Sequence, residues 1–206
     1  MRTCLRLLAP IAAIVGVFAV LLGVLYASSP PLSADERLLL RLPRSVDDLK
    51  HLAQFARELS RDHFATVAGT FVVVYTMAQT FCIPGSLFLT VLGGALFSLP
   101  AALFMVASCT AAGASFSYIL SWSIGSPAVS RLQGPRFLEW QAKLAEHRPY
   151  LFHYIVFLRV APLVPNWFIN LSSPHLSIPL RTFATATWVS SHLRLYTHVS
   201  DPQSKS

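Results

Sequence analysis

Arg159 is the residue in this chain whose position points most directly to chemistry, because it lies inside the apolar run from Tyr150 to Leu171. A charged side chain is costly in hydrocarbon and usually faces a polar cavity or a partner, so it predicts a functional site. Pro162 and Pro165 follow, and a proline lacks a backbone donor and obstructs helix continuation. One plain spanning helix is therefore excluded, and the broken backbone predicts a transport path.

Two interpretations of Arg159 stay open. Its planar guanidinium can bind a phosphate through two parallel hydrogen bonds, which a lysine cannot do, so it is a natural contact for a lipid headgroup. Alternatively, it snorkels toward the interface or pairs with backbone carbonyls for purely architectural reasons. Asn170 begins an Asn-Leu-Ser glycosylation sequon, but its place beside the broken segment makes modification unexpected.

The composition indicates a membrane protein. Of the 206 residues, 54% are apolar and 12% are charged, and the mean hydropathy is +0.55. The net charge of +7 lies in short segments between apolar runs, which is typical of juxtamembrane charge rather than of a nucleic-acid surface. Cysteines and histidines show neither metal-like nor catalytic spacing, so we expect no enzyme, no metal and no cofactor.

The apolar runs divide the chain into four parts. Residues 1–27 are expected to form an N-terminal transmembrane anchor, with a cleaved signal peptide as the alternative. Residues 28–63 form a polar linker with an amphipathic helix, and residues 64–184 form the membrane domain. Residues 185–206 form a C-terminal tail that is too short and too polar to span.

In the membrane domain we predict spanning helices at Phe64–Ile83 and Pro100–Ile124. Between them Pro84–Leu99 reaches only about 24 Å as a helix, against a hydrocarbon core of about 30 Å. Gly93 and Gly94 are expected to break this segment near its middle. Two half-length pieces favour a re-entrant hairpin over a crossing.

The second half repeats this pattern, because Tyr150–Val160 is half a span long and is followed by the proline break. Two interrupted apolar segments in corresponding places are typical of a transport site built from inverted repeats. Gly113, Ser117 and Ser121 form a small-residue stripe between the two breaks, which favours close helix packing over a headgroup path.

Four strings of residues resemble the VTT-domain family, also called DedA or SNARE-associated Golgi proteins, and within it the transmembrane protein 41 branch. They are Phe81-Cys-Ile-Pro-Gly-Ser-Leu-Phe-Leu, Gly93-Gly94-Ala-Leu-Phe, Gly113-Ala-Ser-Phe-Ser-Tyr and Phe157-Leu-Arg-Val-Ala-Pro-Leu-Val-Pro-Asn-Trp-Phe-Ile-Asn-Leu-Ser-Ser-Pro. The last string is the most specific. The similarity covers roughly Asp62 to Ala184.

The resemblance implies an all-α integral membrane protein with multi-pass helices and two re-entrant broken-helix hairpins that face each other, the second repeat being incomplete. It implies a phospholipid scramblase of the endoplasmic reticulum that moves lipids between leaflets and supports autophagosome formation and lipid homeostasis. The implied partners are membrane phospholipids and related membrane proteins in a homo- or hetero-oligomer. The implied headgroup path consists of Arg159, Pro162, Pro165, Asn166, Asn170, Pro84, Gly85, Gly93 and Gly94.

Two features depart from the family pattern. Many bacterial members have acidic residues in the first re-entrant region, whereas Phe64 to Ser130 contains none, so passive movement is favoured over proton coupling. The resemblance fades near Thr187, as in a truncated form. The alternatives are therefore a regulatory or nonproductive protein that binds relatives, or a secondary transporter of an anionic solute.

Overall fold

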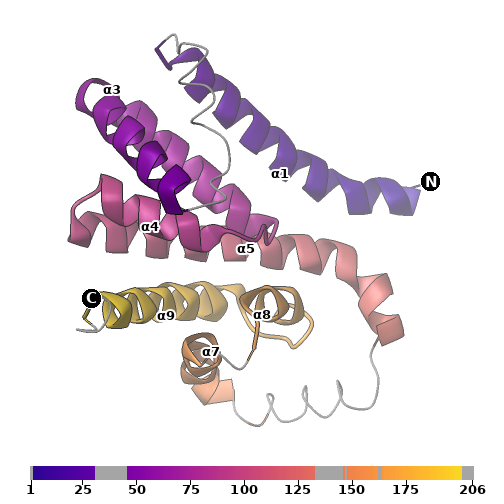
Figure 1. Ribbon diagram of the computed structural model, residues 1–206. Coiled ribbons are helices and arrows are strands. Elements are labelled where there is room, and N and C mark those ends of the chain that lie inside the picture. Colours follow the sequence, from indigo (N-terminus) through magenta and orange to yellow (C-terminus); the bar gives the residue numbers. More distant parts are fainter. Residues whose placement is uncertain (1, 31–45, 133–145, 147, 162–163, 201–206) are drawn as a thin grey trace.

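The long helix α5 separates two groups of helices in this protein (Figure 1). A computed structural model describes residues 2–30, 46–132, 146, 148–161 and 164–200, and every regular element in these ranges is helical. In chain order the elements are α1 (Arg2–Ala27), α3 (Val46–Thr80), α4 (Ser86–Leu96), α5 (Leu99–Leu132), η1 (Arg148–Tyr150), α7 (Leu151–Val160), α8 (Asn166–Ser172) and α9 (Leu180–Ser200). Helices α1, α3 and α4 lie on one side of α5, and α7, α8 and α9 lie on the other (Figure 1).

Two of the described helices are long and apolar enough to cross a membrane, by length and composition. They are Ala9–Ala27 in α1 and Leu99–Gly125 in α5. Helix α1 leaves Val17 and Val20 about 60% exposed, since most of its surface contacts no other helix. Exposed aliphatic side chains of this kind suit contact with lipid.

Helix α3 contains two elements that the sequence predicted separately. The amphipathic helix of the linker and the first predicted span are continuous from Val46 to Thr80, with a kink at His63, where φ is −129° and ψ is 44°. Before the kink, Arg57 donates from Nε to the carbonyl of Ala95 at 2.5 Å, in the last turn of α4. A cation is favourable at that helix end, so the linker helix is held on the bundle.

Pro84 and Gly85 separate α3 from α4, as predicted. The Ile83 N–H donates to the Ala78 carbonyl at 2.8 Å after the last turn of α3, and Cys82 has a left-handed φ of 53°. Pro84 cannot donate a backbone bond, and Gly85 has φ 111°, a region that favours glycine. The chain therefore changes direction between the two helices.

The prediction that Gly93 and Gly94 break the segment was wrong. Both lie inside α4, which is helical without interruption from Ser86 to Leu96. A Cβ at Gly93 would lie 2.8 Å from the ring of Phe71 on α3, whereas a Cβ at Gly94 would meet nothing within 4 Å. Gly93 is thus explained by close packing of α4 on α3 rather than by backbone freedom.

Two apolar clusters flank α5 and hold the bundle together. The first consists of Phe71, Tyr75, Phe97, Ala102, Val106 and Cys109, and Leu89 and Leu96 of α4 pack against it, so it joins α3, α4 and α5. The second joins α5, α7, α8 and α9 through Ala114, Leu151, Ile155, Ile169, Ile178, Phe183 and Ala186. Because α5 contributes to both clusters, it fixes one group of helices relative to the other.

The C-terminal segment belongs to the bundle. The expected boundary between residues 184 and 185 falls inside α9, where Ala186 and Thr187 have no exposed surface. The polar side chains that suggested a separate tail form hydrogen bonds within α9. The Thr187 hydroxyl donates to the Phe183 carbonyl at 2.6 Å, and the Ser190 hydroxyl donates to the Thr187 carbonyl at 3.0 Å. A hydroxyl that donates to a backbone carbonyl of its own helix can be buried with a small free-energy cost.

The small-residue stripe of α5 acts in packing. A Cβ at Gly113 would lie 2.5 Å from the Gln79 Cβ and 2.7 Å from the Thr76 carbonyl oxygen on α3. Ser121, farther along the stripe, donates to the carbonyl of Leu171 on α8 at 2.7 Å. The stripe therefore brings α5 close to one helix on each side.

We expect Gly113→Ala to lower the melting temperature of the detergent-purified protein, with a loss of about 1–3 kcal/mol of stability, because the new methyl group overpacks the contact between α5 and α3. The matched control is Gly94→Ala, another helical glycine, which should leave stability unchanged or raise it by about 1 kcal/mol. Equal melting temperatures for the two variants would contradict the close approach at Gly113.

Candidate functional site

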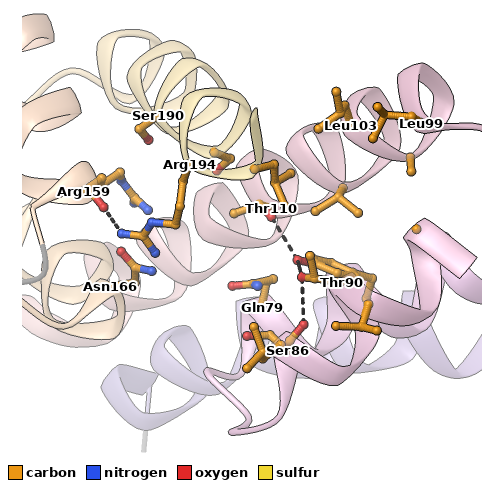
Figure 2. Close-up of a pocket in the computed structure, with 18 residues that line it drawn as sticks. Gln79, Ser86, Thr90, Leu99, Leu103, Thr110, Arg159, Asn166, Ser190 and Arg194 are labelled. Carbon is orange, nitrogen blue, oxygen red and sulfur yellow. Dashed lines mark hydrogen bonds between the residues drawn. The ribbon is translucent and has the colours of Figure 1, made fainter. Parts of the chain in front are cut away.

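A cavity of about 560 Å³ lies between the two groups of helices. It is lined by residues from α3, α4 and α5 on one side and from α7, α8 and α9 on the other, and Figure 2 shows these side chains as sticks. The lining residues are Tyr75, Gln79, Ser86, Leu87, Thr90, Val91, Gly94, Leu99, Ala102, Leu103, Val106, Thr110, Arg159, Asn166, Ser190, Ser191, Arg194 and Leu195. Ser86 and Asn166 in this lining directly follow the two proline-containing segments, which lie in separate halves of the chain.

The two ends of the cavity differ in chemistry. Arg159, Arg194 and Asn166 lie together at one end, while Leu99 and Leu103 lie at the opposite end (Figure 2). Such an arrangement matches an amphiphile, which has a polar head and an apolar tail.

Hydroxyl groups from three helices line the middle of the cavity. The Tyr75 hydroxyl lies 3.0 Å from Thr90 Oγ1, and Thr110 donates to the Tyr75 hydroxyl at 3.4 Å. Thr90 also donates to the Ser86 carbonyl at 3.0 Å (Figure 2). These groups form a polar surface between the cationic end and the apolar end.

Arg159 is held in a buried position by α8 and α9. Its side chain is 4% exposed, and its Nη2 donates to Asn170 Oδ1 of α8 at 2.5 Å. The guanidinium carbon lies 4.9 Å from the centre of the Phe183 ring of α9, at cation–π distance. The Nε–H is buried and has no hydrogen-bond partner among the described residues, which is an unusual state for a buried donor.

Arg194 contacts the end of α7 from α9. Its Nη2 donates to the backbone carbonyl of Arg159 (Figure 2). That carbonyl lies in the last turn of α7, where carbonyl groups have no partner within the helix and a cation is favourable. The bond connects the backbone of one cavity arginine to the side chain of the other.

Acidic residues are absent from the two parts of the sequence that supply the cavity lining. The sequence contains no Asp or Glu from residue 147 to residue 200 and none from residue 64 to residue 138. The salt bridge formed within the described ranges joins Lys50 and Asp47 on the linker helix. The described lining of the cavity is therefore cationic and attracts anions.

The predicted site residues are only partly brought together. Arg159, Asn166 and Gly94 line the cavity, and Asn170 lies behind it, bound to Arg159. The other predicted residues lie elsewhere: Pro165 precedes α8, Pro84 and Gly85 form the exposed start of α4, and Gly93 packs on α3. Pro162 lies outside the described residues.

Sequence reasoning missed the contribution of α9. Ser190, Ser191 and Arg194 line the cavity, and Thr187 lies one turn before them. Their spacing of three and four residues places them on one helical face, and this periodicity was the available signal. On the other side of the cavity, Gln79 and Thr110 lie in largely apolar runs, and the sequence analysis did not identify them as site residues.

The described residues offer no group of three or more His, Cys, Asp or Glu side chains that could hold a metal ion. The cavity can instead contact an anion through guanidinium, amide and hydroxyl groups.

Comparison with known proteins decides the family. The pattern of the VTT domain matches residues 83–200. Transmembrane protein 41B of Gallus gallus is 38% identical over 188 residues, which are 91% of this chain and 69% of that protein. This chain belongs to the VTT-domain family.

Other relatives of this VTT-domain chain cover less of their own length. Transmembrane protein 41B of Xenopus tropicalis is 39% identical over 171 residues, which are 83% of this chain and 62% of that protein. The Homo sapiens protein of the same name is 38% identical over the same share of this chain, which is 59% of its length. This chain thus spans about 60% of these two relatives, and no solved structure matches it.

The family assignment confirms the predicted resemblance and supports a membrane protein. The match begins at residue 83 and runs to residue 200, through the whole of α9. It therefore includes the helix that contributes Ser190 and Arg194 to the cavity.

We expect Asn170→Ala to destabilise this VTT-domain protein by about 1.5–3 kcal/mol, because a buried guanidinium loses its side-chain acceptor. The measurement is the melting temperature in detergent. Asn166→Ala is the matched control, since Asn166 is exposed and forms no bond to Arg159; its effect should stay within about 0.5 kcal/mol. A similar loss in both variants would refute the anchoring role of Asn170.

Proposed function

We propose that this protein moves phospholipids between the leaflets of a membrane as a scramblase. The observation that supports this most directly is the cavity between the two groups of helices, which has Arg159 and Arg194 at one end and leucines at the other. Residence in the endoplasmic reticulum and a role in autophagosome formation belong to the same proposal, through the family resemblance.

The physical barrier to lipid movement is the desolvation of the headgroup. A phosphate without hydrogen bonds is very costly in hydrocarbon, whereas the acyl chains can stay in the bilayer. The guanidinium of Arg159 and the hydroxyls of Thr90 and Thr110 offer substitutes for part of the lost hydration. The apolar lining near Leu103 fits the glycerol end of the acyl chains.

The arrangement of helices supports a multi-pass protein with two re-entrant segments. In the first half the short helix α4 precedes the long helix α5, and in the second half the short helices α7 and α8 precede the longer helix α9. The short helices α4 and α7, of 11 and 10 residues, reach only about 15 Å, half of a hydrocarbon core. In the proposal these pieces enter the membrane from opposite sides and meet at the cavity.

The residue types that line the cavity favour lipid movement that is not coupled to protons. Proton-coupled transporters use acidic or histidine side chains in the membrane as proton carriers. None of the described lining residues is Asp, Glu or His. We therefore expect lipid movement without an ion gradient.

Scrambling is tested in reconstituted vesicles that contain a fluorescent phospholipid and are treated with a membrane-impermeant quencher. We expect the protein to expose inner-leaflet lipid to the quencher, and Arg159→Ala to slow this by about tenfold or more through the loss of a charged hydrogen bond. Arg159→Lys should give an intermediate rate, because lysine keeps the charge but not the planar fork.

Arg181→Ala is the matched control, because Arg181 is an exposed arginine of α9 that does not line the cavity. It should scramble like the parent protein. Arg159→Ala vesicles that scramble at the parental rate would remove this arginine from the mechanism. A rate that depends on an imposed ion gradient would instead identify a coupled transporter.

A further inference from the structure

We propose that Arg194 of α9 and Arg159 of α7 together form a phosphate site with two cations, which prefers lipids of net negative charge to zwitterionic lipids. The inference rests on the proposed function for its lipid, and it adds Arg194 as a second phosphate contact and names the preferred class of headgroup. Both arginines line the same cavity, with Asn166 beside them (Figure 2).

The position of Arg194 is determined by α9. Ser190 and Arg194 are four residues apart on one helical face, and both line the cavity. The same helix places the Phe183 ring at cation–π distance from the Arg159 guanidinium. The hydrogen bond to the Arg159 carbonyl holds the Arg194 side chain at the end of α7. A rigid helix and a hydrogen bond therefore preorganise this cation for a ligand.

Electrostatics then specifies the charge of the ligand. Two guanidinium groups at one cavity repel each other, and this repulsion is strong where water is excluded. No Asp or Glu lies among the described lining residues to offset it. An anion bound between the two groups would replace the repulsion by two attractive interactions, each strengthened by hydrogen bonding.

In the proposal, the buried Nε–H of Arg159 is one of the donors for the anion. Nη2 is occupied by Asn170, while Nε–H has no partner among the described residues. A buried donor without an acceptor is costly, and a phosphate oxygen would satisfy it. Arg159 thus offers a donor that an anionic ligand completes.

A zwitterionic headgroup is the poorer fit. Its phosphate satisfies the same donors, but its ammonium group enters a cavity that already contains two cations and no described carboxylate. A phosphomonoester such as that of phosphatidic acid has no such group and bears more negative charge. Free phosphate shares this chemistry but does not use the apolar end at Leu99 and Leu103.

The test is ligand binding to the full chain in detergent, measured by thermal-shift titration. The probes are dihexanoyl phosphatidic acid, dihexanoyl phosphatidylcholine and inorganic phosphate. We expect phosphatidic acid to bind about tenfold more tightly than phosphatidylcholine, as an additional charged hydrogen bond predicts. Inorganic phosphate should bind more weakly than phosphatidic acid.

Arg194→Gln should reduce this ratio to about one, and Arg181→Gln, the exposed arginine on the same helix, should leave it unchanged. Arg194→Lys keeps the charge and should retain part of the preference, which provides a second variant if the glutamine variant does not fold. Equal binding of the two lipids by the parent protein would overturn the proposal, as would an undiminished preference in both Arg194 variants.

The result is separable from the scramblase test. A preference for phosphatidic acid that depends on Arg194, in a protein that does not scramble, would support the anion site and refute the proposed function. Inorganic phosphate that binds as tightly as phosphatidic acid would support the site with a free anion as its ligand. Scrambling of both lipids without any difference in binding would refute the two-cation site alone.

Discussion

The structure of this protein depends on how one buried guanidinium is accommodated. Arg159 is placed in an apolar helix, and its charge is stabilised by the amide of Asn170 and the ring of Phe183 rather than by a carboxylate. An amide and an aromatic ring disperse the charge without neutralising it, so the guanidinium keeps a net attraction for anions. The packing of α7, α8 and α9 around this group is thus also what makes the cavity cationic.

Helix α5 turns this local arrangement into a site between two halves. It contributes to the apolar cluster with α3 and α4 and to the cluster with α7, α8 and α9. The close approach at Gly113 and the bond from Ser121 to α8 fix both sides on the same helix. The cavity is lined from both sides, and a ligand in it contacts elements that are far apart in the sequence.

Several features were predictable because they depend on residue type. The break at Pro84 and Gly85 was predicted correctly, and Arg159 is buried in a short apolar helix, because a missing N–H, a positive φ and the cost of a charge in an apolar segment depend little on the neighbours. Gly93 was misjudged, because a glycine that allows a ring to approach cannot be distinguished in sequence from a glycine that breaks a helix. The contribution of α9 to the cavity was not predicted, because the burial of a threonine or serine depends on the helices that cover it.

Residue types and their spacing alone established an all-helical membrane chain of the VTT family, with an arginine at an interrupted segment, because hydropathy, prolines and a specific string of residues are local properties. The tertiary structure determines which polar groups are in contact. Asn170 became the anchor of Arg159, Asn166 became part of the cavity wall, and Arg194 came to lie at the end of α7, 35 residues away in the chain. The physical reason is that a contact between distant segments depends on helix packing, and packing depends on the combined shape of side chains from several helices.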